Sequence, residues 1–255
     1  MLRYTNMFLI RALAALLIFS FSFNKCLNAK TILATYDISW NNILLGNIFW
    51  EFSVLPQSYN FSIKLESSGL SSKLYPFYGI YSSSGIKTAE GSFSPEKYNH
   101  VWRGKKKERL VNIVFSDNKI KEITISPEQK NEPFINFFKL DGPTDPITAA
   151  LDLIINDDKK IAKNIFDGRR VYDLSLAYMG VGKIKQKNKI LSTKNYELII
   201  MNYKNVWKDH NNKDLKKVNI VTGIINENLT LPLRFRIVNK GLVFKIHYTG
   251  HKTKG

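Results

Sequence analysis

The sequence predicts a mainly β protein: a strongly curved antiparallel sheet or open β-barrel of about ten strands, with one covering helix. Three observations support this. Apolar and polar residues alternate along many short segments, tight-turn residues join neighbouring segments, and a single longer stretch has helical periodicity. The 255 residues, 44% of them apolar, can bury a substantial core, so we expect a single β-rich domain over residues 30–255.

Alternation is clearest in residues 46–54 and 59–66. In the first segment Ile48, Trp50 and Phe52 share one face, and polar residues occupy much of the other. Successive side chains of a strand point to opposite faces, so each segment presents one face to a core. Further strands are expected at 32–40, 77–88, 97–103, 170–178, 182–191, 194–205 and 217–226.

Two hairpins are marked by their turns. Residues 109–115 and 119–125 flank a Ser-Asp-Asn turn. Residues 230–238 and 242–249 flank a turn whose Gly241 can adopt the positive φ that a tight connection needs. Because these turns join strands that are adjacent in sequence, we expect mostly sequential antiparallel pairing, as in a barrel or sandwich.

The covering helix is expected at about residues 145–156. Asp145 can cap its N-terminus, and Pro146 suits the first helical position because its missing N–H needs no partner there. An apolar stripe then follows at helical spacing, formed by Ile147, Ala150, Leu151 and Ile154. A short helix with one apolar face predicts a plug or lid on a curved sheet. Asp152 is expected to face water, and a single helical turn is expected at 69–74.

Residues 1–29 are typical of a secretory signal peptide. Arg3 and Arg11 precede a twelve-residue apolar core, and a short polar segment ends at Ala29. We therefore expect export to the periplasm and cleavage after Ala29. An uncleaved membrane anchor and lipidation at Cys26 are the alternatives.

Net charge is +17, and removal of residues 1–29 leaves +14. Such a charge is compatible with nucleic-acid binding. Export and the predominance of Lys over Arg argue against it, so we expect no nucleic-acid partner. Lys105, Lys106 and Lys107 form the densest basic run. They fit a solvated turn, or contact with an anionic membrane surface.

The sequence lacks the common motifs of hydrolase, nucleotide-binding and metalloprotease sites. It contains no G-x-S-x-G, no phosphate-binding glycine loop, no G-x-G-x-x-G and no H-E-x-x-H. We therefore expect no catalytic residues, no cofactor and no metal ion.

The strongest candidate for a charged site is the turn Asp167-Gly168-Arg169-Arg170. Adjacent strand residues face opposite sides, so one of the two arginines should point inward. An inward arginine needs a partner, and Asp141, Asp145 and Asp173 are the candidates. The arginine is then either part of a structural ion pair or, with Asp145, part of a binding site for a ligand anion. We name Arg169, Arg170 and Asp145 as candidate ligand-binding residues.

Aromatic residues make up 13% of the chain and include Trp40, Trp50, Trp102 and Trp207. They fit an ordinary core or the lining of an apolar cavity. A closed sheet of about ten strands has more interior than its own side chains usually fill.

Several segments resemble a bacterial exported family labelled domain of unknown function 3108. They are Tyr36-Asp-Ile38 with Gly46, Asp141-Gly-Pro-Thr-Asp-Pro-Ile-Thr-Ala-Ala-Leu151, Phe166-Asp-Gly-Arg-Arg-Val-Tyr-Asp173 and Leu231-Pro-Leu-Arg-Phe-Arg-Ile237. The loop 224–230 departs from the pattern, being rich in Asn where the family has an acidic turn. The resemblance implies a periplasmic, mainly antiparallel β protein, and it supplies no catalytic residues.

Three functions fit these observations. The first is noncatalytic binding of a lipid or another hydrophobic envelope component, with basic residues meeting an anionic headgroup. The second is a structural or interaction module in envelope assembly, with a core filled by its own side chains. The third is an enzyme acting on envelope polysaccharide, which needs paired carboxylates about 5–10 Å apart.

Overall fold

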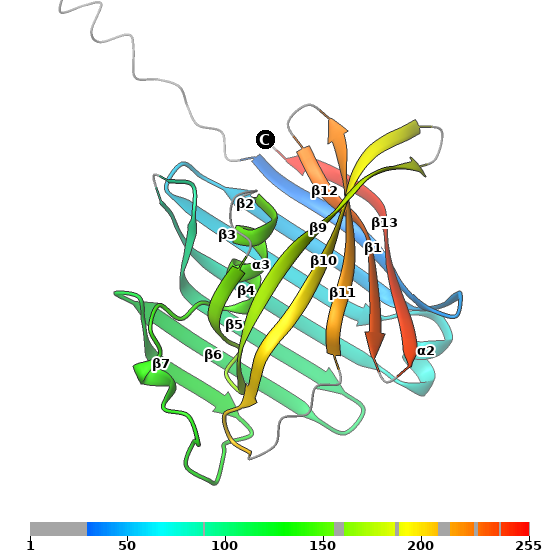
Figure 1. Cartoon of the computed structure of the whole chain (residues 1–255). Coiled ribbons are helices and arrows are strands. Elements are labelled where there is room, and N and C mark those ends of the chain that lie inside the picture. The colour runs from blue at the N-terminus through cyan, green and yellow to red at the C-terminus, as the bar shows by residue number, and fades with distance from the viewer. Residues whose placement is uncertain are drawn as a thin grey trace, which may run out of the picture.

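The computed structural model describes residues 30–88, 90–155, 161–186, 189–208, 215–226, 229–239 and 241–254. Within these residues the chain forms one 13-stranded antiparallel sheet, two short α-helices and one 3-10 helix (Figure 1). The predicted fold class is therefore correct, although the strand number exceeds the expected ten or eleven. The predicted signal peptide lies outside the described residues.

The sheet consists of two runs of sequential strands. The first run comprises β1 (Lys30–Trp40), β2 (Ile43–Val54), β3 (Ser58–Ser67), β4 (Phe77–Lys87), β5 (Phe93–Gly104), β6 (Glu108–Ser116) and β7 (Lys119–Ser126). The second comprises β8 (Ile161–Phe166), β9 (Arg170–Gln186), β10 (Lys189–Asn205), β11 (Leu215–Asn226), β12 (Leu229–Asn239) and β13 (Leu242–Lys254). Helix α2 (Gly69–Leu74) lies between β3 and β4, where a helical turn was predicted.

The first and last strands join the two runs. β1 pairs with β13 over most of its length, for example Ile38 with Ile246, and the strand order runs from β7 through β1 and β13 to β8. β7 and β8 are the two edges and do not pair with each other, so the sheet curls without closing.

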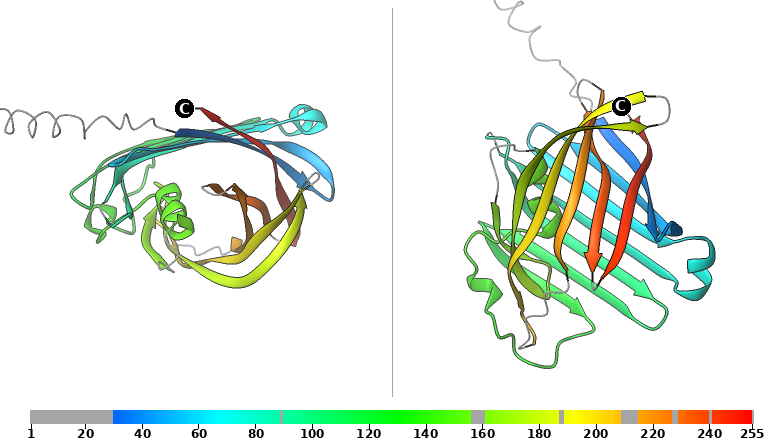
Figure 2. Two further views of the ribbon diagram at one scale, coloured as in Figure 1. Left: turned by 90° about the horizontal axis from the view of Figure 1, so that it is seen from above. Right: turned by 45° about the vertical axis from the view of Figure 1, so that its right-hand side comes forward.

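Helix α3 (Pro146–Ile155) lies between the two edges, where the sheet does not close (Figure 2). Its residues pack against β8 and β9 on one side and β4 and β5 on the other. Beside the helix, three backbone or side-chain contacts span the gap between the two edges of the sheet. Thr144 forms a parallel bridge with Ile165, Phe134 N donates to Val206 O at 2.8 Å, and Arg169 Nη2 donates to Ser126 O at 3.2 Å. The helix therefore covers the concave face as the sequence predicted.

The inner face follows the predicted alternation. On neighbouring strands the register pairs Ala34 with Trp50, Trp50 with Ile63, and Ile63 with Tyr81. These residues form one row across the concave surface. Large aliphatic and aromatic residues dominate the three buried clusters, which explains why the sheet curves around its apolar side.

Three local expectations were wrong. The segment 182–191 is not one strand, because Gln186 pairs with Lys189 and the chain reverses between them. β8 was not predicted. Asp152 is buried rather than solvated, and its carboxylate accepts a hydrogen bond from Phe93 N at 3.3 Å.

Candidate ligand-binding cavity

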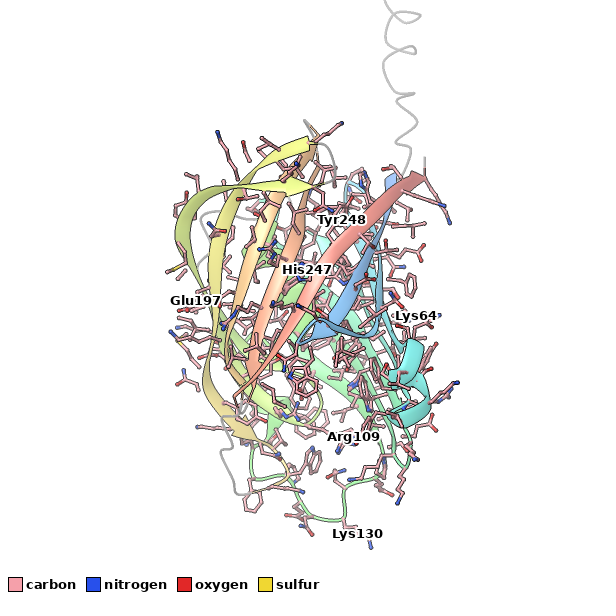
Figure 3. The ribbon with its side chains drawn as sticks, turned by 90° about the vertical axis from the view of Figure 1, so that its right-hand side faces the viewer. Lys64, Arg109, Lys130, Glu197, His247 and Tyr248 are labelled. Carbon is pink, nitrogen blue, oxygen red and sulfur yellow. The ribbon has the colours of Figure 1, made fainter. Side chains whose placement is uncertain are left out.

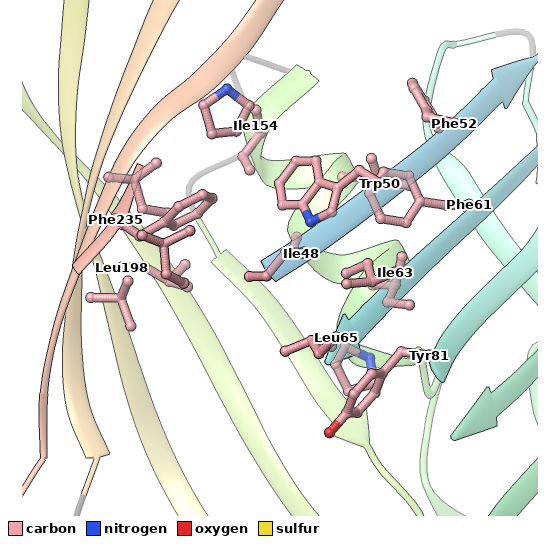
Figure 4. Close-up of a pocket in the computed structure, with 18 of the residues that line it drawn as sticks. Ile48, Trp50, Phe52, Phe61, Ile63, Leu65, Tyr81, Ile154, Leu198 and Phe235 are labelled. Atoms are coloured by element: carbon pink, nitrogen blue, oxygen red, sulfur yellow. The ribbon is translucent and has the colours of Figure 1, made fainter. Parts of the chain in front are cut away.

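The concave face and helix α3 enclose a cavity of about 550 Å³. Its lining comes from both runs of strands and from one face of the helix. Figure 4 shows Trp50, Phe61 and Ile63 on one wall, and Leu198 and Phe235 on the opposite wall. Because the walls come from distant parts of the sequence, the cavity exists only in the folded sheet.

The body of the cavity is apolar. The helix contributes Pro146, Ile147, Ala150, Leu151 and Ile154, which include the whole predicted stripe. Trp50 also lines the cavity. Trp207 instead packs in the core beside Phe137, and its Nε1 donates to Gly168 O at 3.1 Å. An apolar space of this size, lined by several aromatic rings, fits a hydrophobic guest.

One end of the cavity is polar. It is formed by Tyr81, His100, Asp167 and Arg170, from β4, β5, the β8–β9 turn and the start of β9. The rings of Tyr81 and His100 stack with centroids 4.2 Å apart. Among the described residues, buried His100 Nε2 has no hydrogen-bond partner. A ligand atom entering this end would therefore meet a ring nitrogen with spare bonding capacity.

The electrostatic environment of this end is positive. Burial lowers the pKa of His100 to about 4, and the nearby charges of Arg169, Arg109 and Arg170 add to the effect. Arg109 lies on the same face of β6 as buried Val111, toward the lower end of the sheet in Figure 3. The charges of three arginines thus act on an imidazole that is neutral at pH 7. Arg170 is paired with Asp167, so Arg169 and Arg109 supply the positive charge in excess, which favours an anionic guest.

Asp167 is the acidic residue at this end. Its Oδ1 accepts hydrogen bonds from the backbone N of Arg169 at 2.9 Å and of Arg170 at 2.8 Å. Its Oδ2 lies 3.2 Å from Arg170 Nη1. Burial raises the pKa of Asp167, while the Arg170 charge and these hydrogen bonds oppose that shift. The Asp167 carboxylate therefore holds both the turn and the Arg170 side chain in place.

The two predicted arginines diverge, as strand alternation requires. Arg170 lines the cavity and lies over the Tyr203 ring, 5.9 Å from its centroid. Arg169 reaches across the opening to Ser126 O, and its buried Nε has no partner among the described residues. The expected partner of the inward arginine was wrong: it is Asp167, not Asp141, Asp145 or Asp173. The Asp173 carboxylate accepts from Asn164 N at 2.9 Å instead.

Asp145 anchors the helix to the sheet. Its side chain is fully buried and accepts four hydrogen bonds: from the N atoms of Ile147 and Thr148, the Oγ of Ser83 and the Oγ1 of Thr148. The Tyr59 hydroxyl joins the same network, 2.5 Å from Thr148 Oγ1. The predicted cap is confirmed, and it also fixes α3 against β3 and β4. Asp145 is not among the cavity-lining residues.

Sequence reasoning did not single out Tyr81 and His100. The available signal was the alternation in the expected strand 97–103, which places Tyr98, His100 and Trp102 on one face. In the part of the chain that the structure describes, no three His, Cys, Asp or Glu side chains are grouped as a metal site. None of its helices is long and apolar enough to cross a bilayer.

Comparisons with known proteins show a likeness at the level of fold. No family model matches the chain, and no curated protein matches it. Among solved structures the chain is similar to a beta-barrel-like protein of domain of unknown function DUF1849 from Brucella abortus, with a TM-score of 0.49. The two share 11% sequence identity, and the match covers 88% of this chain and 98% of that one.

Proposed function

We propose that this chain is an exported, noncatalytic periplasmic protein that binds a lipid or another hydrophobic envelope component. One observation carries the proposal: an apolar cavity of about 550 Å³ lies under a helix and has a cationic end. A cavity in this range encloses a ligand of moderate size. Burial of the ligand's apolar surface would supply affinity at about 25 cal/mol per Å².

The polar end would hold the ligand's anionic group. Arg170 lines this end and provides a guanidinium that can pair with a carboxylate or phosphate. Neutral His100 offers its ring nitrogen beside it. Arg169 and Arg109 would act through their field, because both contribute to the potential at His100. Asp145 has no role in this scheme beyond fixing the helix.

The competing functions have less support. A polysaccharide hydrolase needs two carboxylates across a cleft. Of the described residues that line the cavity, only Asp167 carries a carboxylate, and Arg170 and two backbone N–H groups occupy it. A purely structural module would fill its core with its own side chains, whereas this one leaves a space.

Export of the protein and its family relationship are part of the same proposal. The signal-like residues 1–29 support export, and the motifs around Asp141–Leu151 and Phe166–Asp173 support a relationship to domain of unknown function 3108. The first feature bears on where the protein acts, and the second bears on its evolutionary relationship. Neither feature identifies a residue of the binding site.

The test compares ligand retention in matched arginine variants. Every described strand and helix lies within residues 30–254, and β1 pairs with β13, so the chain from Lys30 holds the complete sheet. Arg170→Ala should reduce the mass excess that co-purifies with this chain, seen by native mass spectrometry. Arg236→Ala removes the same charge from an exposed position on β12 and should leave the excess unchanged. Equal retention in both variants would remove Arg170 from the site.

A further inference from the structure

The hairpin of β9 and β10 extends beyond its neighbours. β8 pairs with β9 no further than Ser175, and β11 pairs with β10 only from Thr193. In the described residues, 178–186 of β9 therefore pair only with β10, and 189–192 of β10 pair only with β9. We call residues 178–186 and 189–194 the ribbon. In Figures 1 and 2 it crosses the end of the molecule where the C-terminus lies.

The ribbon has two different faces. On its inner face Leu191 packs against the cluster that contains Leu231 and Tyr248, and Gln186 Nε2 donates to Tyr248 O at 3.1 Å. On its outer face the register pairs Val181 with Lys194, Lys183 with Ser192 and Lys185 with Ile190. The inner contacts hold the ribbon to the rest of the sheet, so its outer face points away from the molecule.

The outer side of the ribbon exposes large apolar side chains. Val181 is 77% exposed and Ile190 is 72% exposed, and Met179 is 62% exposed. Lys183 and Lys185 are exposed on the same face. Apolar and basic side chains therefore share one surface, so burial of apolar area and attraction to anionic lipids can act together there.

The charge of this segment has one sign. Residues 174–196 contain five Lys and no acidic residue. Exposed Lys252 and Lys254 at the end of β13 add positive charge at the same end of the molecule. The exposed strand edges of the ribbon could pair with a second copy, but two such ribbons would repel each other.

We propose that the ribbon docks the protein on an anionic lipid bilayer. Its lysines would meet the headgroups, while Val181, Ile190 and their apolar neighbours enter the interfacial region. The docking surface is separate from the cavity, since the ribbon's exposed residues are not among those that line it.

A second basic surface provides a matched control. Lys105, Lys106 and Lys107 occupy the β5–β6 turn at the opposite end of the molecule. They lie beside α2, which exposes Leu70 and Leu74. Replacing those three lysines removes the same charge as replacing three lysines of the ribbon. The two triple variants therefore separate a local docking surface from a general effect of net charge.

The test measures sedimentation of the chain from Lys30 with vesicles of phosphatidylcholine, alone or with 30% phosphatidylglycerol. We expect binding to the anionic vesicles only, and weaker binding as salt rises. The triple variant Lys183→Gln, Lys185→Gln, Lys194→Gln, which changes exposed lysines of the outer face, should lower the partition coefficient by about 100-fold, because each lysine near such a surface contributes about five-fold. Lys105→Gln, Lys106→Gln, Lys107→Gln should change it by less than about three-fold.

Other results would overturn the docking surface. These are equal binding to neutral vesicles, an equal loss in both triple variants, or no vesicle binding in the wild type. Val181→Trp gives a readout that does not depend on the triple variant folding. Its emission should shift to the blue on anionic vesicles, and an unchanged spectrum would contradict insertion. A ribbon variant that loses vesicle binding yet retains a co-purified ligand would show that docking and the cavity act independently.

Discussion

Tyr81 and His100 occupy paired positions on β4 and β5, and their rings stack with centroids 4.2 Å apart and planes 14° apart. The pair lies at the polar end of the cavity, beside Arg170 and Asp167. Burial and the nearby arginine charges keep the imidazole neutral, while burial raises the pKa of the Tyr81 hydroxyl to about 12. The polar end therefore presents two neutral rings and an arginine to any guest at neutral pH.

His100 should make stability depend on pH. Its pKa in the folded protein, about 4, lies below the value near 6.5 of an exposed histidine. As pH falls through this window, the unfolded chain binds the proton first, so the free energy of unfolding should decrease. With a discount for partial exposure, the loss at pH 5 is about 1 kcal/mol. Between pH 7.5 and pH 5, urea unfolding should show a loss about 1 kcal/mol larger in wild type than in His100→Gln. His247, whose pKa burial also lowers, contributes equally to both proteins. Equal losses in both would contradict the buried, neutral imidazole.

Gly168 allows the β8–β9 turn to approach β6. Its φ is +87°, and a Cβ at this position would collide with the Val111 side chain, which is 1% exposed. Gly168→Ala should therefore lower the free energy of unfolding by about 2–4 kcal/mol, from backbone strain and overpacking together.

Gly142 is the matched control for this substitution. It also has positive φ, +52°, but nothing lies within 4 Å of its added Cβ. Gly142→Ala should cost only the backbone strain, about 1 kcal/mol. If the two alanine variants unfold at the same urea concentration, the contact between the turn and Val111 is not a packing constraint.

The buried Asp145 network should contribute strongly to stability. Asp145→Ala leaves Ser83, Thr148 and the first helical N–H groups without their acceptor, so we expect a loss of about 2–5 kcal/mol. Asp141→Ala changes an exposed acidic residue four positions earlier and should cost less than about 0.5 kcal/mol. Chemical denaturation of both variants checks the prediction. A small effect at Asp145 would show that α3 does not depend on this anchor.

Filling the cavity should displace a ligand without unfolding the protein. Ala150 on α3 lines the cavity and is only partly buried, so the ring of Ala150→Phe has space to enter. We expect less co-purified ligand and an unchanged or slightly higher unfolding midpoint. Ala177→Phe, on the other face of β9 from Leu174 and Leu176, is the control and should retain the ligand. Full retention in Ala150→Phe would place the ligand elsewhere.

Strand alternation predicted the sheet well because burial of one face imposes period 2 on the sequence. Ile48, Trp50 and Phe52 lie on the concave side, as their spacing required. The error at 182–191 has a physical cause: Lys and Ile continue to alternate on both sides of the reversal at Gln186 and Lys189. β8 was missed because it is short and its register shifts near Asn164, whose φ is +54°.

The candidate site was only partly accessible from sequence. Alternation placed one of the two adjacent arginines inside, and Arg170 is that residue. Its partner Asp167 lies three residues earlier in the same turn, a contact made by turn geometry rather than by strand pairing. Tyr81 and His100 meet only through the β4–β5 register, which the sequence does not encode locally. The residues missed from single segments are therefore those that pairing between strands brings into the site.

The central claim is that the cavity holds a hydrophobic ligand, and native mass spectrometry tests it most directly. The chain from Lys30 would be purified from the periplasm, weighed under native conditions, and extracted with organic solvent for lipid analysis. We predict a stoichiometric mass excess that extracts as one lipid class and decreases in Arg170→Ala. A bare mass that stays unchanged after incubation with envelope lipids would contradict ligand binding and favour a structural or interaction module.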